Sequence, residues 1–110
     1  MELKLPFKVK IKYLNEHENS FQGKVVFHEK EYSIIIRPQE NEKIIKVSFP
    51  VMGVTDNQIL VRVSGPSGVY VQDHVKFKGK GKFIEIFSDI IFYEIVNNQK
   101  KLDTLEIFVK

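Results

Sequence analysis

Residues 3–13 read Leu-Lys-Leu-Pro-Phe-Lys-Val-Lys-Ile-Lys-Tyr, so apolar side chains alternate with lysines at almost every position. Successive side chains of a β-strand point to opposite faces, which puts the apolar residues on one face and the lysines on the other. The apolar set is Leu3, Leu5, Phe7, Val9, Ile11 and Tyr13. This pattern predicts a strand in a sheet that is packed on one side and solvated on the other.

Short apolar segments of the same kind follow along the whole chain, with turn residues between them every 8–12 positions. Alanine is absent while Ile, Val and Phe are abundant, which favours strands over helices. We expect about eight or nine strands and little or no helix. Residues 90–96 are predicted to be a strand that pairs with residues 102–109. Spacing of this kind is typical of an antiparallel β-sandwich or a small barrel.

Residues 57–68 read Asn-Gln-Ile-Leu-Val-Arg-Val-Ser-Gly-Pro-Ser-Gly, an alternating strand that runs into a Gly-Pro-Ser-Gly turn. This strand and turn are similar to those of filamin-type immunoglobulin-like repeats, and the resemblance covers the C-terminal half, residues 57–109. The sequence departs from the family at 78–83, where Lys-Gly-Lys-Gly-Lys-Phe replaces an acidic Asp-Gly turn. The resemblance implies an all-β, immunoglobulin-like antiparallel β-sandwich, and we expect residues 1–110 to form one such domain.

The resemblance also implies a binding site. Filamin-type repeats take partner peptides along exposed strand edges, which would correspond here to residues 58–64 and 69–75. The exposed residues of this edge would include Arg62, Tyr70 and Gln72. Main-chain hydrogen bonds to an added strand provide the affinity in this mode of recognition. The first expectation is therefore a non-enzymatic interaction or scaffold module with a protein partner or with a second copy of itself.

The positive charge supports an alternative function. The formal net charge is +3 and the isoelectric point is about 9.1. Two short clusters hold eight of the 17 basic residues, namely Lys4, Lys8, Lys10, Lys12, Lys76, Lys78, Lys80 and Lys82. Lysines interleaved with aromatic residues at 76–83 favour binding of nucleic acid or another anionic surface.

Each lysine cluster also has a purely structural interpretation. The first-strand lysines would protect an exposed sheet edge from pairing with other chains. The second cluster would be the solvated tip of a hairpin around residues 79–81, with Phe77 and Phe83 pointing into the core. One continuous anion-binding track would require both clusters to lie on the same side of the fold.

Catalytic and metal-binding signatures are missing from the sequence. There is no cysteine, and His17, His28 and His74 are far apart in sequence. The aspartates occur singly near expected turns, where Asp side chains support turn formation. We therefore expect no cofactor, no metal site and no enzymatic activity, the last unless a pocket assembles in three dimensions. We expect no membrane span. The composition suits a reducing cytoplasm, although secreted domains can also lack cysteine.

Overall fold

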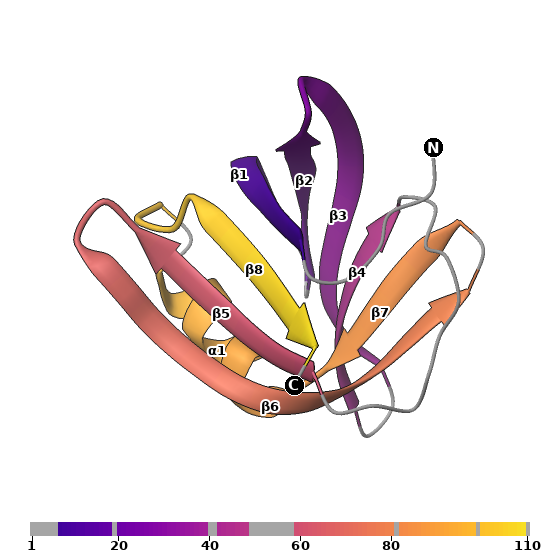
Figure 1. Ribbon diagram of the computed structural model, residues 1–110. Coiled ribbons are helices and arrows are strands. Elements are labelled where there is room, and N and C mark those ends of the chain that lie inside the picture. Colours follow the sequence, from indigo (N-terminus) through magenta and orange to yellow (C-terminus); the bar gives the residue numbers. More distant parts are fainter. Residues whose placement is uncertain are drawn as a thin grey trace.

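The computed structural model describes residues 7–18, 20–39, 42–48, 59–80, 82–98 and 100–109, which form eight strands and one helix (Figure 1). The strands are β1 (Phe7–His17), β2 (Ser20–Phe27), β3 (Lys30–Gln39), β4 (Glu42–Ser48), β5 (Ile59–Gly65), β6 (Gly68–Lys80), β7 (Phe83–Phe87) and β8 (Thr104–Val109). The helix α1 (Asp89–Asn98) comes between β7 and β8 in the chain.

All eight strands pair antiparallel in one closed barrel, in the order β1-β2-β3-β4-β7-β6-β5-β8. The expected immunoglobulin-like β-sandwich is therefore wrong. The pairing of the last strand distinguishes the barrel from a sandwich: β8 pairs with β5 on one side and with β1 on the other, which closes the sheet. Closure of the sheet leaves no room for a second layer, since the apolar faces of the strands point into the barrel and pack against one another.

Strand β1 follows the predicted alternation in its first half. Val9 and Ile11 are buried, whereas the lysines next to them are exposed. The prediction that Tyr13 shares the buried face is wrong, because Tyr13 is 45% exposed. The pairing with β2 shifts register between Ile11 and Tyr13, and such a bulge inverts the alternation that follows. Leu14 therefore packs against the core in place of Tyr13.

Two of the predicted turns of the C-terminal half are present, at residues 65–68 and close to residues 79–81. Gly65 pairs with Gly68 across the turn between β5 and β6, and Gly68 has a φ of 118° that favours glycine. Lys80 pairs with Phe83 across the turn between β6 and β7. Strand β6 is 13 residues long and pairs with two strands, with β5 along its first part and with β7 along its last part.

The core lies inside the barrel and consists mainly of β-branched and aromatic side chains, with contributions from every strand. Its fully buried members include Ile34, Ile36, Ile45, Ile59, Ile84, Ile86, Leu105 and Ile107. Helix α1 adds Ile91, Phe92 and Ile95 to the same cluster. Within the described part of the chain, no helix has the length and apolar character needed to cross a membrane.

Helix α1 is a second correction, because residues 90–96 were predicted to be a strand. Ser88 starts the helix: its Oγ accepts a hydrogen bond from the Ile91 amide at 3.1 Å and donates one to Asp73 Oδ2 at 3.3 Å. A serine at this position satisfies an amide that the helix itself leaves unpaired. Ile91, Phe92 and Ile95 then face the core, with the spacing of one helical face.

The cap gives a stability prediction. Ser88→Ala is expected to lower the free energy of unfolding by about 1–2 kcal/mol, because the Ile91 amide loses its acceptor and the Asp73 carboxylate loses a donor. Urea denaturation followed by circular dichroism measures this loss. Ser67→Ala is the matched control, because Ser67 is an exposed turn residue and its replacement should change stability by less than about 0.5 kcal/mol. Equal stability of the two variants would contradict the capping role.

Candidate functional site

Three neighbouring strands, β4, β7 and β6, carry lysines and phenylalanines on the outer wall of the barrel. In Figure 1, β4 and β7 lie to the right of centre, and the last part of β6, which pairs with β7, reaches the same side. Because Ile84 and Ile86 point into the core, the alternation of β7 turns the other side chains of that strand outward. We call this surface the lysine–phenylalanine face and define it as Lys46, Lys76, Lys78, Phe83, Glu85 and Phe87.

Strand pairing brings these side chains together in rows. Lys46 lies opposite Glu85, which lies opposite Lys78 on the other side. Phe87 lies opposite Lys76 in the next row. Phenylalanines thus occupy the central strand, and lysines occupy both strands that flank it. Neighbouring strands are about 4.8 Å apart, so lysines on either side can reach a molecule lying along β7.

Two lysine ammonium groups lie over the phenylalanine rings. Lys46 Nζ is 4.0 Å from the centroid of the Phe83 ring, and Lys78 Nζ is 5.6 Å from that of Phe87. Both distances are within the range of cation–π attraction. The rings are half-buried, so part of each remains accessible from outside. Positive charge and aromatic surface are therefore adjacent in the folded protein.

The face is positively charged. It holds three lysines and one carboxylate, that of Glu85, and Lys43 lies beside it at the start of β4. Glu85 forms no hydrogen bond or ion pair with any described side chain, although Lys46 and Lys78 lie in register on either side. The excess of positive charge is therefore not cancelled locally, which favours an anionic ligand.

The face extends towards helix α1. Lys43 Nζ lies 5.5 Å from the Phe92 ring centroid and 5.9 Å from that of Tyr93. Tyr93 is 54% exposed, which makes it an accessible aromatic ring beside a lysine. The same combination of cation and ring therefore occurs at the start of β4 as well as on β7.

The predicted hairpin lysines are placed as follows. Lys76 and Lys78 are exposed on the outer wall, and Lys82 is exposed in the turn before β7. The backbone of Lys80 lies in β6, but its side chain is outside the described part. The expectation that both phenylalanines of this hairpin point into the core is correct for one and wrong for the other. Phe77 packs against the core as expected, whereas Phe83 is on the outer wall with the lysines.

The first-strand lysines have acidic or polar neighbours. Lys8 lies opposite Glu106 and Lys10 opposite Thr104, and Lys12 Nζ forms an ion pair with Glu31 Oε2 at 2.7 Å. The hydrogen bond between these two groups, with the charge of each, raises the pKa of Lys12 and lowers that of Glu31. Lys4 lies outside the described residues.

Strand β1 is also not an edge strand. It pairs with β8 on one side and with β2 on the other, so the edge-protection interpretation is wrong. The two lysine clusters are separated on the barrel wall by β8 and β5 in one direction and by β2, β3, β4 and β7 in the other. A single anion-binding track through both clusters is therefore excluded.

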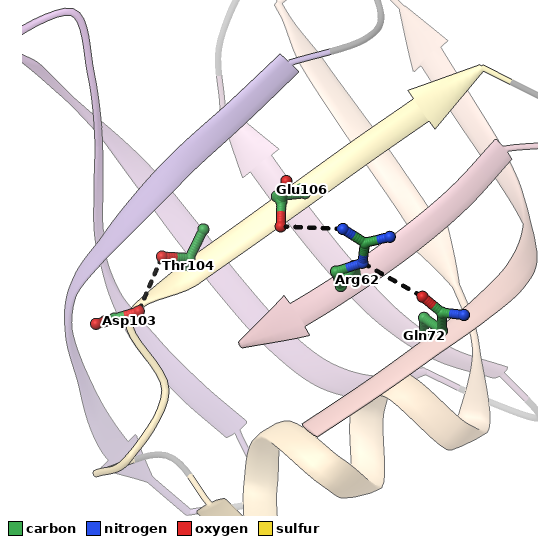
Figure 2. A network of polar contacts seen from close by, with 5 residues as sticks. All are labelled: Arg62, Gln72, Asp103, Thr104 and Glu106. Carbon is green, nitrogen blue, oxygen red and sulfur yellow. Dashed lines mark hydrogen bonds and ion pairs between the residues drawn. The ribbon is translucent and has the colours of Figure 1, made fainter. Parts of the chain in front are cut away.

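The residues expected at a partner-binding edge lie within the barrel wall. Figure 2 shows Arg62 between its two neighbouring strands: its Nε donates to Gln72 Oε1 at 3.3 Å, and a guanidinium nitrogen lies 3.8 Å from Glu106 Oε1. Residues 59–64 of β5 pair with both β6 and β8, so this strand has no free edge there. Tyr70 packs partly against the core instead of standing free.

A shallow hollow of about 270 Å³ lies elsewhere, on the outer side of β1, β2 and β3. In it, Lys24 Nζ donates a hydrogen bond to Ser33 Oγ at 3.2 Å. Its lining residues are Tyr13, Asn15, His17, Gln22, Gly23, Lys24, Ser33, Ile34 and Ile35. Among the residues that the structure describes, no group of three His, Cys, Asp or Glu side chains could hold a metal ion.

Lys46, Phe87 and Glu85 are members of this surface that the residue patterns did not predict. The available signal was the polarity of Glu85, which predicts that residues two positions away on the same strand also point outward. Comparisons with protein-family models, curated proteins and solved structures gave no match to this chain.

Proposed function

We propose that this protein binds single-stranded nucleic acid, without catalysis, on the lysine–phenylalanine face. The observation that carries the proposal is the placement of Phe83 and Phe87 on the outer wall of one strand, with lysines on both neighbouring strands. Binding of single strands without sequence preference uses this combination: aromatic rings stack on the bases, and positive groups follow the phosphates.

The dimensions of the face suit a few nucleotides. Phe83 and Phe87 are four residues apart on a strand, which separates them by about 13 Å. Each ring can stack on one base, because every base has a π-face, and each such contact contributes about 1–3 kcal/mol. The lysines on β4 and β6 can then contact phosphates on either side. A duplex hides its bases in the stack, so the rings favour a single strand over a duplex.

The expected protein-interaction role receives less support. It depends on exposed strand edges at residues 58–64 and 69–75, and residues 59–64 of β5 pair with strands on both sides. Residues 69–75 of β6, which include Tyr70 and Gln72, pair with β5, whereas β7 pairs with residues 76–80. The Arg62 guanidinium lies 5.0 Å from the Phe108 ring centroid, but Glu106 lies 3.8 Å from the same guanidinium, so the positive charge there is offset. An anionic lipid surface would contact the lysines but gives no role to the aromatic rings that lie between them. Binding to anionic lipid vesicles is therefore tested as the alternative.

The test is a salt titration of binding. A fluorescein-labelled eight-nucleotide single strand of mixed sequence is titrated with the protein, and fluorescence anisotropy gives the Kd. We expect about four phosphate contacts, three from Lys46, Lys76 and Lys78 of the face and one from Lys82 in the adjacent turn. The Kd is then expected to rise about 50-fold between about 50 mM and 200 mM salt. This follows because each neutralised phosphate of a single strand contributes about 0.7 to the logarithmic salt slope.

The salt slopes of two double variants show whether the lysine–phenylalanine face is the binding surface. Lys76→Gln with Lys78→Gln should reduce the salt slope by about 1.4. Lys8→Gln with Lys10→Gln removes the same charge from β1 and should leave the slope unchanged. Absence of binding at about 20 mM salt, where electrostatic contacts are strongest, would overturn the proposal. So would binding to phosphatidylserine vesicles without binding to the oligonucleotide.

A further inference from the structure

Glu85 occupies the centre of the lysine–phenylalanine face and is its one described carboxylate. It lies on β7 between Phe83 and Phe87, about 6.6 Å along the strand from each. Lys46 and Lys78 flank it in register, yet their ammonium groups lie over the phenylalanine rings, and neither forms an ion pair with the carboxylate. The carboxylate is thus half-buried beside two rings and has no described partner.

We propose that Glu85 selects the nucleobase, favouring one that presents an amino group, such as cytosine, over one that presents a carbonyl, such as thymine. This inference rests on the proposed function, because it concerns a base stacked on Phe83 or Phe87. An ionised carboxylate only accepts hydrogen bonds. Cytosine offers the N4 amino group as a donor, whereas thymine has an oxygen at the same ring position.

The charge of Glu85 supports a role in contacting bases instead of phosphates. A carboxylate in the centre of a phosphate-binding surface repels the backbone and weakens binding of every sequence. The same group is favourable when it faces the edge of a base, because hydrogen bonds with an ionised acceptor are stronger than neutral ones. Glu85 lies between the two stacking rings on β7, and the ammonium groups of its in-register neighbours Lys46 and Lys78 lie over those rings. A base stacked on either ring therefore brings its edge close to the Glu85 carboxylate.

The experiment compares two homopolymers that differ in this edge. Fluorescein-labelled eight-nucleotide oligo-dC and oligo-dT are titrated separately at pH 7.5 and low salt. Both are pyrimidines of similar size and stacking, so the ratio of their Kd values isolates the edge chemistry. Oligo-dC is expected to bind about tenfold more tightly, the effect of one charge-assisted hydrogen bond.

Glu85→Gln tests the residue directly. An amide both donates and accepts, so it can bond to either pyrimidine, and the dC-to-dT ratio should fall to about one. Both oligonucleotides should also bind more tightly, because a negative charge has been removed. Glu16→Gln removes the same charge from an exposed position on β1 and should leave the ratio at its wild-type value.

The outcomes separate this inference from the proposed function. Salt-dependent binding with equal Kd values for the two oligonucleotides would overturn the role of Glu85 and leave the proposed function intact. A preference for oligo-dC that persists in Glu85→Gln would assign the selection to another group and would also overturn the inference. Failure of both oligonucleotides to bind would remove the proposed function itself.

Discussion

Replacing Phe83 and Phe87 together with alanine is expected to weaken binding of an eight-nucleotide single strand by about 100-fold. Each ring that stacks on a base contributes about 1–3 kcal/mol, so two rings together contribute about 2–6 kcal/mol, and a 100-fold loss corresponds to about 2.8 kcal/mol in the lower half of that range. A loss of 1.4 kcal/mol corresponds to a tenfold change in Kd. Fluorescence anisotropy at fixed salt measures the change, and circular dichroism verifies that the variant is folded.

Two further variants show whether stacking is the cause. Phe108→Ala is a matched control, because Phe108 is on β8, outside the lysine–phenylalanine face. Its ring lies 5.0 Å from the guanidinium of Arg62 on β5, so it also has a cation above it. The Phe108→Ala variant should bind like the wild type. Phe83→Leu with Phe87→Leu keeps the apolar bulk but removes the π-face, and it should lose nearly as much affinity as the alanine variant. If the leucine variant retains full affinity, the rings serve packing, and stacking has no part in binding.

Much of the secondary structure could be predicted from residue patterns because the signals are local. The alternation at Val9 and Ile11, the turn at residues 65–68 and the hairpin around residues 79–81 each depend on neighbouring residues only. Barrel closure is different. It depends on β8 pairing with β1 and β5 at once, and those partners lie far away in the sequence. The alternation of apolar and polar residues is the same in a sandwich and in a barrel, so it does not distinguish the two folds. The resemblance to filamin repeats favoured the sandwich, which is wrong.

Three errors have separate physical causes. The bulge that turns Tyr13 outward adds a residue to one strand without any change in composition. Helix α1 is only ten residues long, so its helical spacing is too short to stand out from alternation. Phe83 is apolar, as are all but one of the residues of β7, and apolarity does not reveal which face is buried. Glu85 alone carried that information, and with it the position of the candidate site.

The largest stability effect is expected at Gly23 on β2. A Cβ atom built there would lie 1.8 Å from the Tyr13 carbonyl oxygen, which belongs to the backbone of β1. Because a backbone atom cannot rotate away, β1 and β2 would have to separate next to the bulge at Tyr13. Gly23→Ala is therefore expected to lower the free energy of unfolding by about 3 kcal/mol or more, measured by urea denaturation.

Gly68→Ala provides the comparison. An added methyl group there meets nothing within 4 Å, so its cost is limited to the φ of 118°, about 1–2 kcal/mol. A Gly23→Ala variant that is as stable as Gly68→Ala would mean that β1 does not approach β2 this closely. Binding gives a second measurement. Strands β1 and β2 lie away from β6 and β7 on the barrel wall, so any Gly23→Ala protein that remains folded should bind nucleic acid with the wild-type Kd.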